Sequence, residues 1–227
     1  MTGQVEKYFL DWEETFSAGV NLAGGKGWNL GRLAHYGFDV PLGGTVTTKA
    51  YAVFIQENGL ADQVREAAAC ASQSVPDEAA LMLKLNKLRE SFCQGKLSEK
   101  VSKEISGGLI SLGLADELLA VRSSASAEDS QGASFAGMHD SFLNVQGLEQ
   151  VLASVKECYA SLWTPRALLY RQKMGLKDTE VIPAVILMKM VKAAAAGIGF
   201  SCNPQSGRLD QIVINANYGL GESVVGG

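Results

Sequence analysis

The stretch AVRSSASAEDSQGASFAGMHDSFLNV, residues 120–145, joins two short apolar segments through a loop of small and polar side chains. The segment 117–122, ELLAVR, has four apolar residues at 118–121 and predicts a strand that ends at Arg122. The segment 140–145 predicts a second strand, because aromatic and β-branched residues favour extended backbone. Loop side chains this small allow the backbone to fold closely over a ligand. The stretch therefore predicts a strand–loop–strand unit with a candidate ligand site at the loop.

An arginine at the end of an apolar strand is a candidate anion ligand. The planar guanidinium of Arg122 suits bidentate contacts with phosphate or carboxylate. Hydroxyl groups that can add hydrogen bonds follow it at Ser123, Ser124 and Ser126. The sequence equally allows a surface loop in which Arg122 pairs with Glu128 or Asp129. These two acids are also a candidate magnesium site, because Mg²⁺ prefers carboxylate and phosphate oxygens.

Closer to the N-terminus, the sequence GGKG at residues 24–27 is a second candidate site. Glycines let the backbone approach a ligand, and the N-terminus of the helix that follows favours an anion. Lys26 adds a positive charge that suits phosphate. The Walker A pattern is not matched, and a plain glycine turn with a solvated lysine explains the sequence as well. The segment NANYGLGES at 215–223 is a third candidate site, with glycines at 219 and 221. A tight turn explains these glycines equally well.

The remaining pattern predicts an α/β (α+β) fold. Residues 20–25 are expected to form a loop, and helices are expected to end at Gly37 and Gly59. A helical insert spans 60–113, where apolar residues recur at three- and four-residue spacing. A mostly antiparallel β region with two helices follows it. The predicted strands lie in 181–191, 195–204 and 208–219, and the predicted helices lie in 147–163 and, after a Thr164 cap and Pro165, in 166–175.

The bulk composition is that of a soluble globular chain. The 227 residues are 47% hydrophobic and 19% charged, with a net charge of -4. This balance gives no long-range attraction to nucleic acid or to an anionic membrane. The four cysteines form no CxxC pair, so zinc is not expected. We expect no signal peptide, no membrane span and a cytoplasmic location.

Five blocks in order resemble the nucleotide-binding domain of the pyruvate, phosphoenolpyruvate dikinase type. They are GGKGWNLGRLAHYGFDVPLGGTVTTKAYAVFI (24–55), AVRSSASAEDSQGASFAGMHDSFLNV (120–145), CYASLWTPRALLYR (158–171), AGIGFSCNP (196–204) and NYGLGESVVGG (217–227). The form of the second block resembles phosphoenolpyruvate synthase (pyruvate, water dikinase) and rifampin phosphotransferase. The resemblance covers nearly the whole chain outside the helical insert.

The resemblance implies an ATP-grasp-like domain that binds ATP between two lobes. We expect the first lobe to span 1–116, with the insert, and a β-rich second lobe to span 117–227, incomplete at its C-terminus. It further implies that ATP and Mg²⁺ are the cofactors. The β-phosphate of ATP passes to a histidine on another domain, which releases AMP and phosphate, and a third domain uses the phosphohistidine on pyruvate or another acceptor.

The resemblance also implies roles for single residues. Lys26 and Arg122 match phosphate-contacting positions and are the candidate catalytic residues. Gly137 and Ser141 match nucleotide-contacting positions, with serine where the family often has threonine. Met188 stands where many members have a glutamine near the adenine, so a side-chain partner of the base is replaced.

The magnesium ligands of the family are expected beyond Gly227, and so are the phosphohistidine and pyruvate-binding domains. We therefore expect that this chain alone does not complete the reaction, because phosphoryl transfer depends on positioning and on charge neutralisation. Two alternatives stay open: the ATP-binding part of a rifampin phosphotransferase-like enzyme, and a non-catalytic nucleotide-binding remnant.

Overall fold

The computed structural model describes residues 7–71, 78–125, 141–176, 181–221 and 224. The chain forms two compact units, Met1–Met190 and Val191–Gly227. The first unit holds a five-stranded sheet in the order β1-β2-β5-β3-β4, in which all neighbouring strands are antiparallel. The strands are β1 (Phe9–Asp11), β2 (Gly43–Val46), β3 (Leu119–Ala125), β4 (Ser141–Val145) and β5 (Pro183–Lys189).

β5 lies at the centre of the sheet. β5 pairs with β2 on one side and with β3 on the other. The sheet therefore joins strands from both sides of the expected lobe boundary at 116 and 117. The two compact units divide after Met190, and the expected lobes 1–116 and 117–227 stay a prediction. The α/β (α+β) class is confirmed. The chain combines helices with an antiparallel sheet, and helices and strands do not alternate regularly along the sequence.

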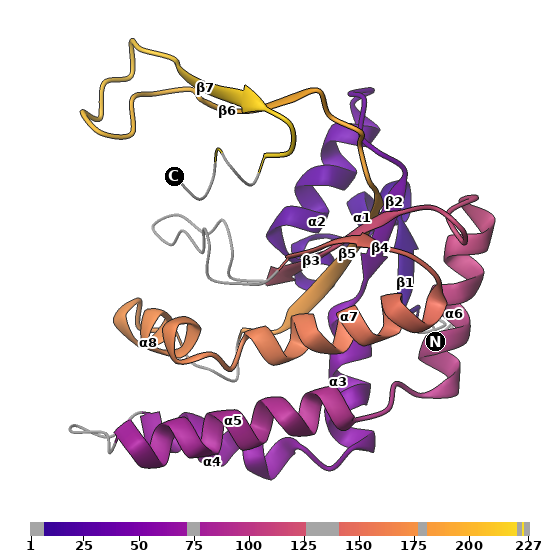
Figure 1. The fold of residues 1–227 in the computed structure, drawn as a ribbon, viewed down its shortest axis with the longest axis vertical. Coiled ribbons are helices and arrows are strands. Elements are labelled where there is room, and N and C mark those ends of the chain that lie inside the picture. Colours follow the sequence, from indigo (N-terminus) through magenta and orange to yellow (C-terminus); the bar gives the residue numbers. More distant parts are fainter. Residues whose placement is uncertain (1–6, 72–77, 126–140, 177–180, 222–223, 225–227) are drawn as a thin grey trace. The chain divides into compact units, whose positions relative to one another are not determined.

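Helices lie on both faces of this sheet (Figure 1). Two of them, α1 (Trp12–Ala18) and α2 (Val20–His35), lie on one face. On the other face α7 (Leu148–Ser161) contacts β3, and the insert helix Glu78–Gln94 packs against α7, whereas the insert helix Glu99–Ser111 contacts β1 directly. The remaining helices are α3 (Thr48–Glu57), α4 (Ala61–Ala71), α5 (Glu78–Gln94), α6 (Glu99–Ser111) and α8 (Pro165–Lys173).

The main core lies on the α7 side of the sheet. Val121 of β3 and Val185 and Leu187 of β5 belong to it, together with buried side chains of the insert helices. Tyr159 of α7 contacts the rings of Tyr51 and Phe54 within this core. Burial raises the pKa of Tyr51 to about 12. The insert is helical as predicted, and its apolar faces are part of the main core rather than a separate appendage.

Short-range signals set several helix ends. The side chain of Thr164 accepts a hydrogen bond from Ala167 N at 3.2 Å, so α8 begins at Pro165 as predicted. Gly37 and Gly59 follow α2 and α3 with φ of 80° and 63°, which confirms them as stop signals. The predicted loop at 20–25 was wrong, because α2 begins at Val20 and is only interrupted at Gly24.

The second unit contains an antiparallel pair of strands. β6 (Ala195–Phe200) pairs with β7 (Val213–Tyr218), from Ala195 opposite Tyr218 to Phe200 opposite Val213. Both strands were predicted from the sequence. They form their own two-stranded sheet and do not pair with β5.

Candidate functional site

The glycine turn at residues 24–27 interrupts α2 at the point where this helix packs against β3. Gly24 has φ 69° and ψ 169°, a conformation that is essentially restricted to glycine. A Cβ atom at Gly24 would lie 2.0 Å from the carbonyl oxygen of Ser124. This glycine is therefore needed for the close approach of α2 to β3, and the expected close approach to a ligand does not account for it.

The hydroxyl of Ser124 joins this turn to β3 by two hydrogen bonds. Gly27 N donates to Ser124 Oγ at 3.0 Å, and Ser124 Oγ donates to Ala23 O at 3.0 Å. Ser124 is fully buried. Both hydrogen bonds of the Ser124 hydroxyl are thus made to the turn. One of them satisfies the backbone N–H of Gly27, near the start of the second part of α2. The expectation that Ser124 contacts a ligand directly is corrected.

Lys26 lies within the glycine turn and extends to β3. Its Nζ donates to the carbonyl oxygen of Ser123 at 3.5 Å, and its side chain is half-buried. Ser123 is the residue after Arg122 in the strand. The turn and the strand, nearly 100 residues apart in sequence, thus bring the ammonium of Lys26 to the backbone beside Arg122.

Arg122 lies near the middle of β3, opposite Ser141 of β4 and Ile186 of β5. Side chains that face each other across strands share one face of a sheet, and alternate residues along a strand share it too. Arg122 therefore lies on the same face as Ser124, which is the face covered by α2. We call this face, marked by Thr45, Arg122, Ser124 and Ile186, the α2 face.

Arg122 is half-buried on the α2 face. No other residue in the described part of the chain hydrogen-bonds or ion-pairs with its guanidinium. The alternative ion pairs with Glu128 or Asp129 fall outside the described residues, and so does the magnesium site that those acids could form. A guanidinium without a protein partner favours an anion, because charge-assisted bonds then replace part of its hydration.

Ser141 and Met188 complete the described part of the candidate site. Ser141 is exposed and pairs with Arg122 across the β3–β4 ladder. Met188 is half-buried and pairs with Ala120, so it shares the α2 face and lies roughly 7–8 Å diagonally from Arg122. Gly137 and Ser126 lie outside the described residues. Four of the five predicted site residues thus belong to neighbouring elements of the first unit.

Two further hydroxyls were not distinguished by sequence. Ser123 is adjacent to Arg122 in the strand, so its side chain lies on the opposite face of the sheet. Its Oγ is buried there without a hydrogen-bond partner among the described residues. Thr45 is buried on the α2 face, and a Cβ at Gly27 would lie 3.0 Å from its Oγ1. Strand alternation could have separated Ser123 from Ser124, whereas no local signal identifies Thr45.

The arrangement suits the binding of a polyanion. Lys26 and Arg122 supply two positive charges on adjoining backbone segments, and the second part of α2 begins at Gly25 beside them. Among the described residues, no three His, Cys, Asp or Glu side chains gather as metal ligands. The two cations of the described site therefore suit an anionic ligand, and the described residues supply no magnesium site.

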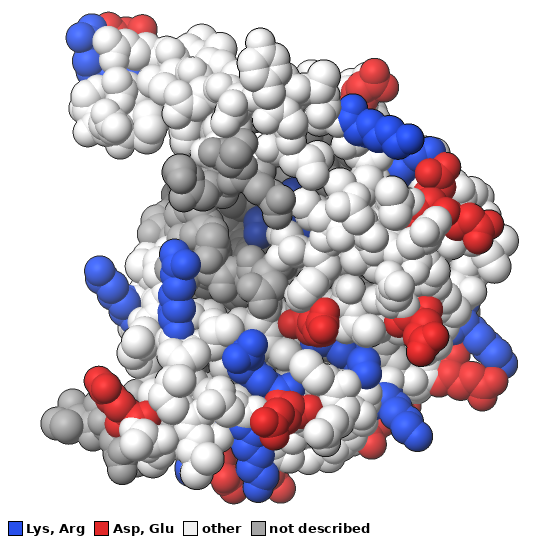
Figure 2. Space-filling model, viewed as in Figure 1, with Lys and Arg blue, Asp and Glu red and all other residues white. Residues whose placement is uncertain are grey.

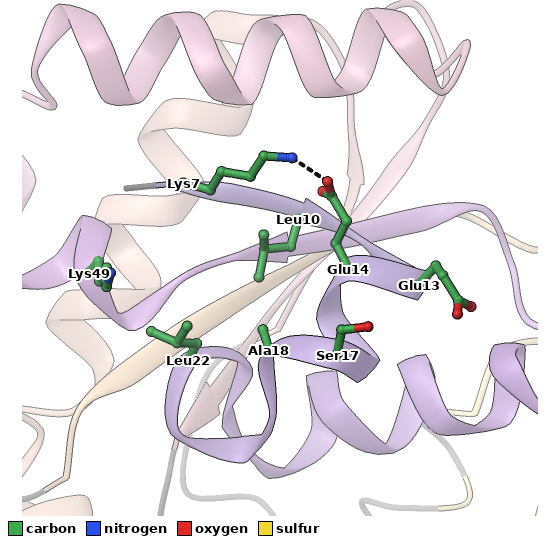
Figure 3. Close-up of a pocket in the computed structure, with 8 residues that line it drawn as sticks. All are labelled: Lys7, Leu10, Glu13, Glu14, Ser17, Ala18, Leu22 and Lys49. Carbon is green, nitrogen blue, oxygen red and sulfur yellow. Dashed lines mark hydrogen bonds and ion pairs between the residues drawn. The ribbon is translucent and has the colours of Figure 1, made fainter. Parts of the chain in front are cut away.

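A separate open pocket of about 420 Å³ lies between β1, α1 and the N-terminal ends of α2 and α3 (Figure 3). Lys7 and Glu14 at its rim form an ion pair, which raises the pKa of Lys7. None of the predicted site residues lines it. The ion pair partly neutralises the charges at this rim, so the pocket is a weaker candidate for an anion than the α2 face.

The visible surface over the helices of the first unit mixes lysine and arginine with aspartate and glutamate (Figure 2). No helix in the described ranges is long and apolar enough to cross a membrane. The charge pattern on this face favours ordinary solvated pairs, since no single-sign patch dominates it.

Comparison with known proteins links this chain to a family. Residues 20–227 match the family described as "Pyruvate phosphate dikinase, AMP/ATP-binding domain". The chain is 40% identical over 224 residues to a probable phosphoenolpyruvate synthase of Methanocaldococcus jannaschii, with 96% of the chain and 19% of that protein covered. It is 40% identical over 229 residues to a probable phosphoenolpyruvate synthase of Staphylothermus marinus, with 98% and 27% covered.

A relative that is a different kind of phosphotransferase is also similar to the chain. The chain is 37% identical over 229 residues to a rifampicin phosphotransferase of Streptomyces sviceus, with 100% of the chain and 26% of that protein covered. The chain thus spans between about a fifth and a third of the length of its curated relatives. Those relatives contain further polypeptide beyond the matched region.

Proposed function

The chain belongs to the pyruvate phosphate dikinase AMP/ATP-binding domain family, and on that premise we propose that Lys26 and Arg122 bind the phosphates of ATP on the α2 face. The observation that carries the proposal is the contact of Lys26 Nζ with the carbonyl of Ser123, directly after Arg122. Two cations beside one short strand segment can neutralise adjacent phosphate groups.

Each described residue has a proposed task. The guanidinium of Arg122 binds phosphate oxygens in its planar fork, and the ammonium of Lys26 binds them as a point charge. The exposed hydroxyl of Ser141, opposite Arg122, donates a further hydrogen bond to the nucleotide. Met188 packs against the adenine through its thioether side chain, which offers apolar contact in place of a hydrogen bond. Gly137, in the loop between β3 and β4, is proposed to approach the nucleotide with its backbone.

The wider reaction is proposed from the family. We propose an ATP-grasp-like domain of a phosphoenolpyruvate synthase-like enzyme, which uses Mg²⁺ and passes the β-phosphate to a histidine of another domain for phosphorylation of pyruvate. In that reaction, Lys26 and Arg122 stabilise the negative charge on the transferring phosphate. The rifampicin phosphotransferase relative supports a second candidate, with the same ATP site and an antibiotic as the acceptor.

Calorimetry on the chain tests the binding step. ATP, with and without Mg²⁺, and adenosine are titrated separately into the protein. If the phosphates carry the affinity, ATP binds at least tenfold more tightly than adenosine. Equal affinities, or no saturable ATP binding at millimolar concentration, would contradict the proposal.

A further inference from the structure

The hydroxyl of Ser124 lies at the junction of the glycine turn and β3. It accepts from Gly27 N and donates to Ala23 O, both at 3.0 Å. A hydroxyl has one donor hydrogen and can accept in addition, so a single side chain satisfies both backbone groups. Because Ser124 is fully buried, water does not compete for these bonds.

The two bonds flank the lysine of the turn. Lys26 lies between Ala23 and Gly27 in sequence, so its backbone is held on both sides by the same hydroxyl. Arg122 lies two residues before Ser124 on the same face of β3. The position of the Lys26-bearing turn relative to the Arg122-bearing strand is thus fixed at Ser124.

We propose that Ser124 is a positioning residue that sets the spacing between the Lys26 ammonium and the Arg122 guanidinium. The inference rests on the proposed binding of ATP phosphates at these two cations. Two charges bind neighbouring phosphate groups well only when supporting hydrogen bonds hold them at a matching separation. Ser124 does this without touching the nucleotide, since its hydroxyl is already engaged by the turn.

The first experiment compares Ser124→Ala with Ser161→Ala. Ser161 is a matched control, because it is a buried serine of α7 whose Oγ donates to Cys158 O at 2.8 Å, away from the site. ATP affinity is measured by calorimetry at a temperature where circular dichroism shows both variants folded. Ser124→Ala is expected to weaken ATP binding at least tenfold, and Ser161→Ala less than twofold. Equal changes in the two variants would overturn the proposal.

The second experiment separates positioning from general loss of structure. In a double-mutant cycle, Ser124→Ala is combined with Lys26→Ala. If Ser124 acts by placing Lys26, its loss weakens ATP binding less than threefold in the Lys26→Ala background. A full tenfold effect in that background would show that Ser124 acts independently of Lys26.

The outcomes for the two proposals are distinct. If the unmodified chain does not bind ATP, or if Lys26→Ala leaves its affinity unchanged, the proposed site fails. If both results support the site but Ser124→Ala binds ATP normally, only the positioning role fails. Should Ser124→Ala not fold, Ser124→Cys replaces it. Its thiol is a weaker hydrogen-bonding group, so it is expected to weaken ATP binding at least threefold, and unchanged affinity would overturn the role.

Discussion

Replacing Gly24 by alanine tests how the glycine turn is held against β3. The new Cβ would lie 2.0 Å from Ser124 O and 2.3 Å from Ser124 Oγ. The first of these atoms belongs to the backbone of β3, which is paired on both sides in the sheet, so a side-chain rotation does not remove the overlap. The turn must therefore move away from β3.

The expected cost has two parts. Holding a non-glycine residue at φ 69° and ψ 169° costs about 1–3 kcal/mol. Moving the turn also breaks the two hydrogen bonds of the Ser124 hydroxyl, at about 0.5–1.5 kcal/mol each. Gly24→Ala should therefore lower the free energy of unfolding by about 2–6 kcal/mol. That is a large share of the 5–15 kcal/mol that is usual for a domain.

Urea denaturation followed by circular dichroism measures this change, with two glycine controls. Gly37→Ala has φ of 80° but no atom within 4 Å of the added Cβ, so it reports backbone strain alone. Gly107→Ala lies inside α6 with open space around it and should stabilise by about 0.5–1 kcal/mol. If Gly24→Ala costs no more than Gly37→Ala, the argument from close approach to β3 is refuted.

Three further results are expected. Met188→Gln should tighten ATP binding about twofold to tenfold, as measured by calorimetry, because one added hydrogen bond contributes about 0.5–1.5 kcal/mol. Unchanged affinity would argue against adenine near this position. Thr164→Ala should lower the free energy of unfolding by about 1 kcal/mol in urea titrations, with the m-value unchanged, because α8 loses its N-cap bond. Burial and the carboxylate of Glu157 raise the pKa of Cys93, so less thiolate is present at a given pH. Alkylation of Cys93, followed by peptide mass spectrometry, should therefore have its half-rise above the pH of about 8.5 usual for a free thiol, and Glu157→Gln should shift it downward.

Local patterns predicted most elements of the fold. The proline after Thr164 and the glycines at 37 and 59 act within a few residues, so their signals are readable in the sequence. The alternation in β3 likewise depends only on neighbouring residues. The insertion of β5 between β2 and β3 has no such signal, since it depends on which distant strands bury the most apolar surface together.

The sequence identified the charged residues of the candidate site, but not the contacts that hold the glycine turn against β3. Lys26 and Arg122 were identified by residue type and by family resemblance, and the structure places the Lys26 ammonium at the backbone carbonyl of Ser123, the residue after Arg122. The sequence left the glycines at 24–27 open between a ligand site and a plain turn, because glycine approaching a ligand and glycine approaching a strand have the same sequence pattern. Only the three-dimensional contact with Ser124 distinguishes them.

The most direct test of the phosphate site is the ATP affinity of Arg122→Ala relative to Arg65→Ala, measured by calorimetry under identical conditions. Arg65 is an exposed arginine of α4 that pairs with Asp62, so its loss removes the same charge away from the site. Loss of charge-assisted bonds worth about 1.5–3 kcal/mol predicts ATP binding that is about tenfold to a hundredfold weaker in Arg122→Ala, and nearly unchanged in Arg65→Ala. Equal affinities for the two variants would contradict the assignment of Arg122 as a phosphate ligand.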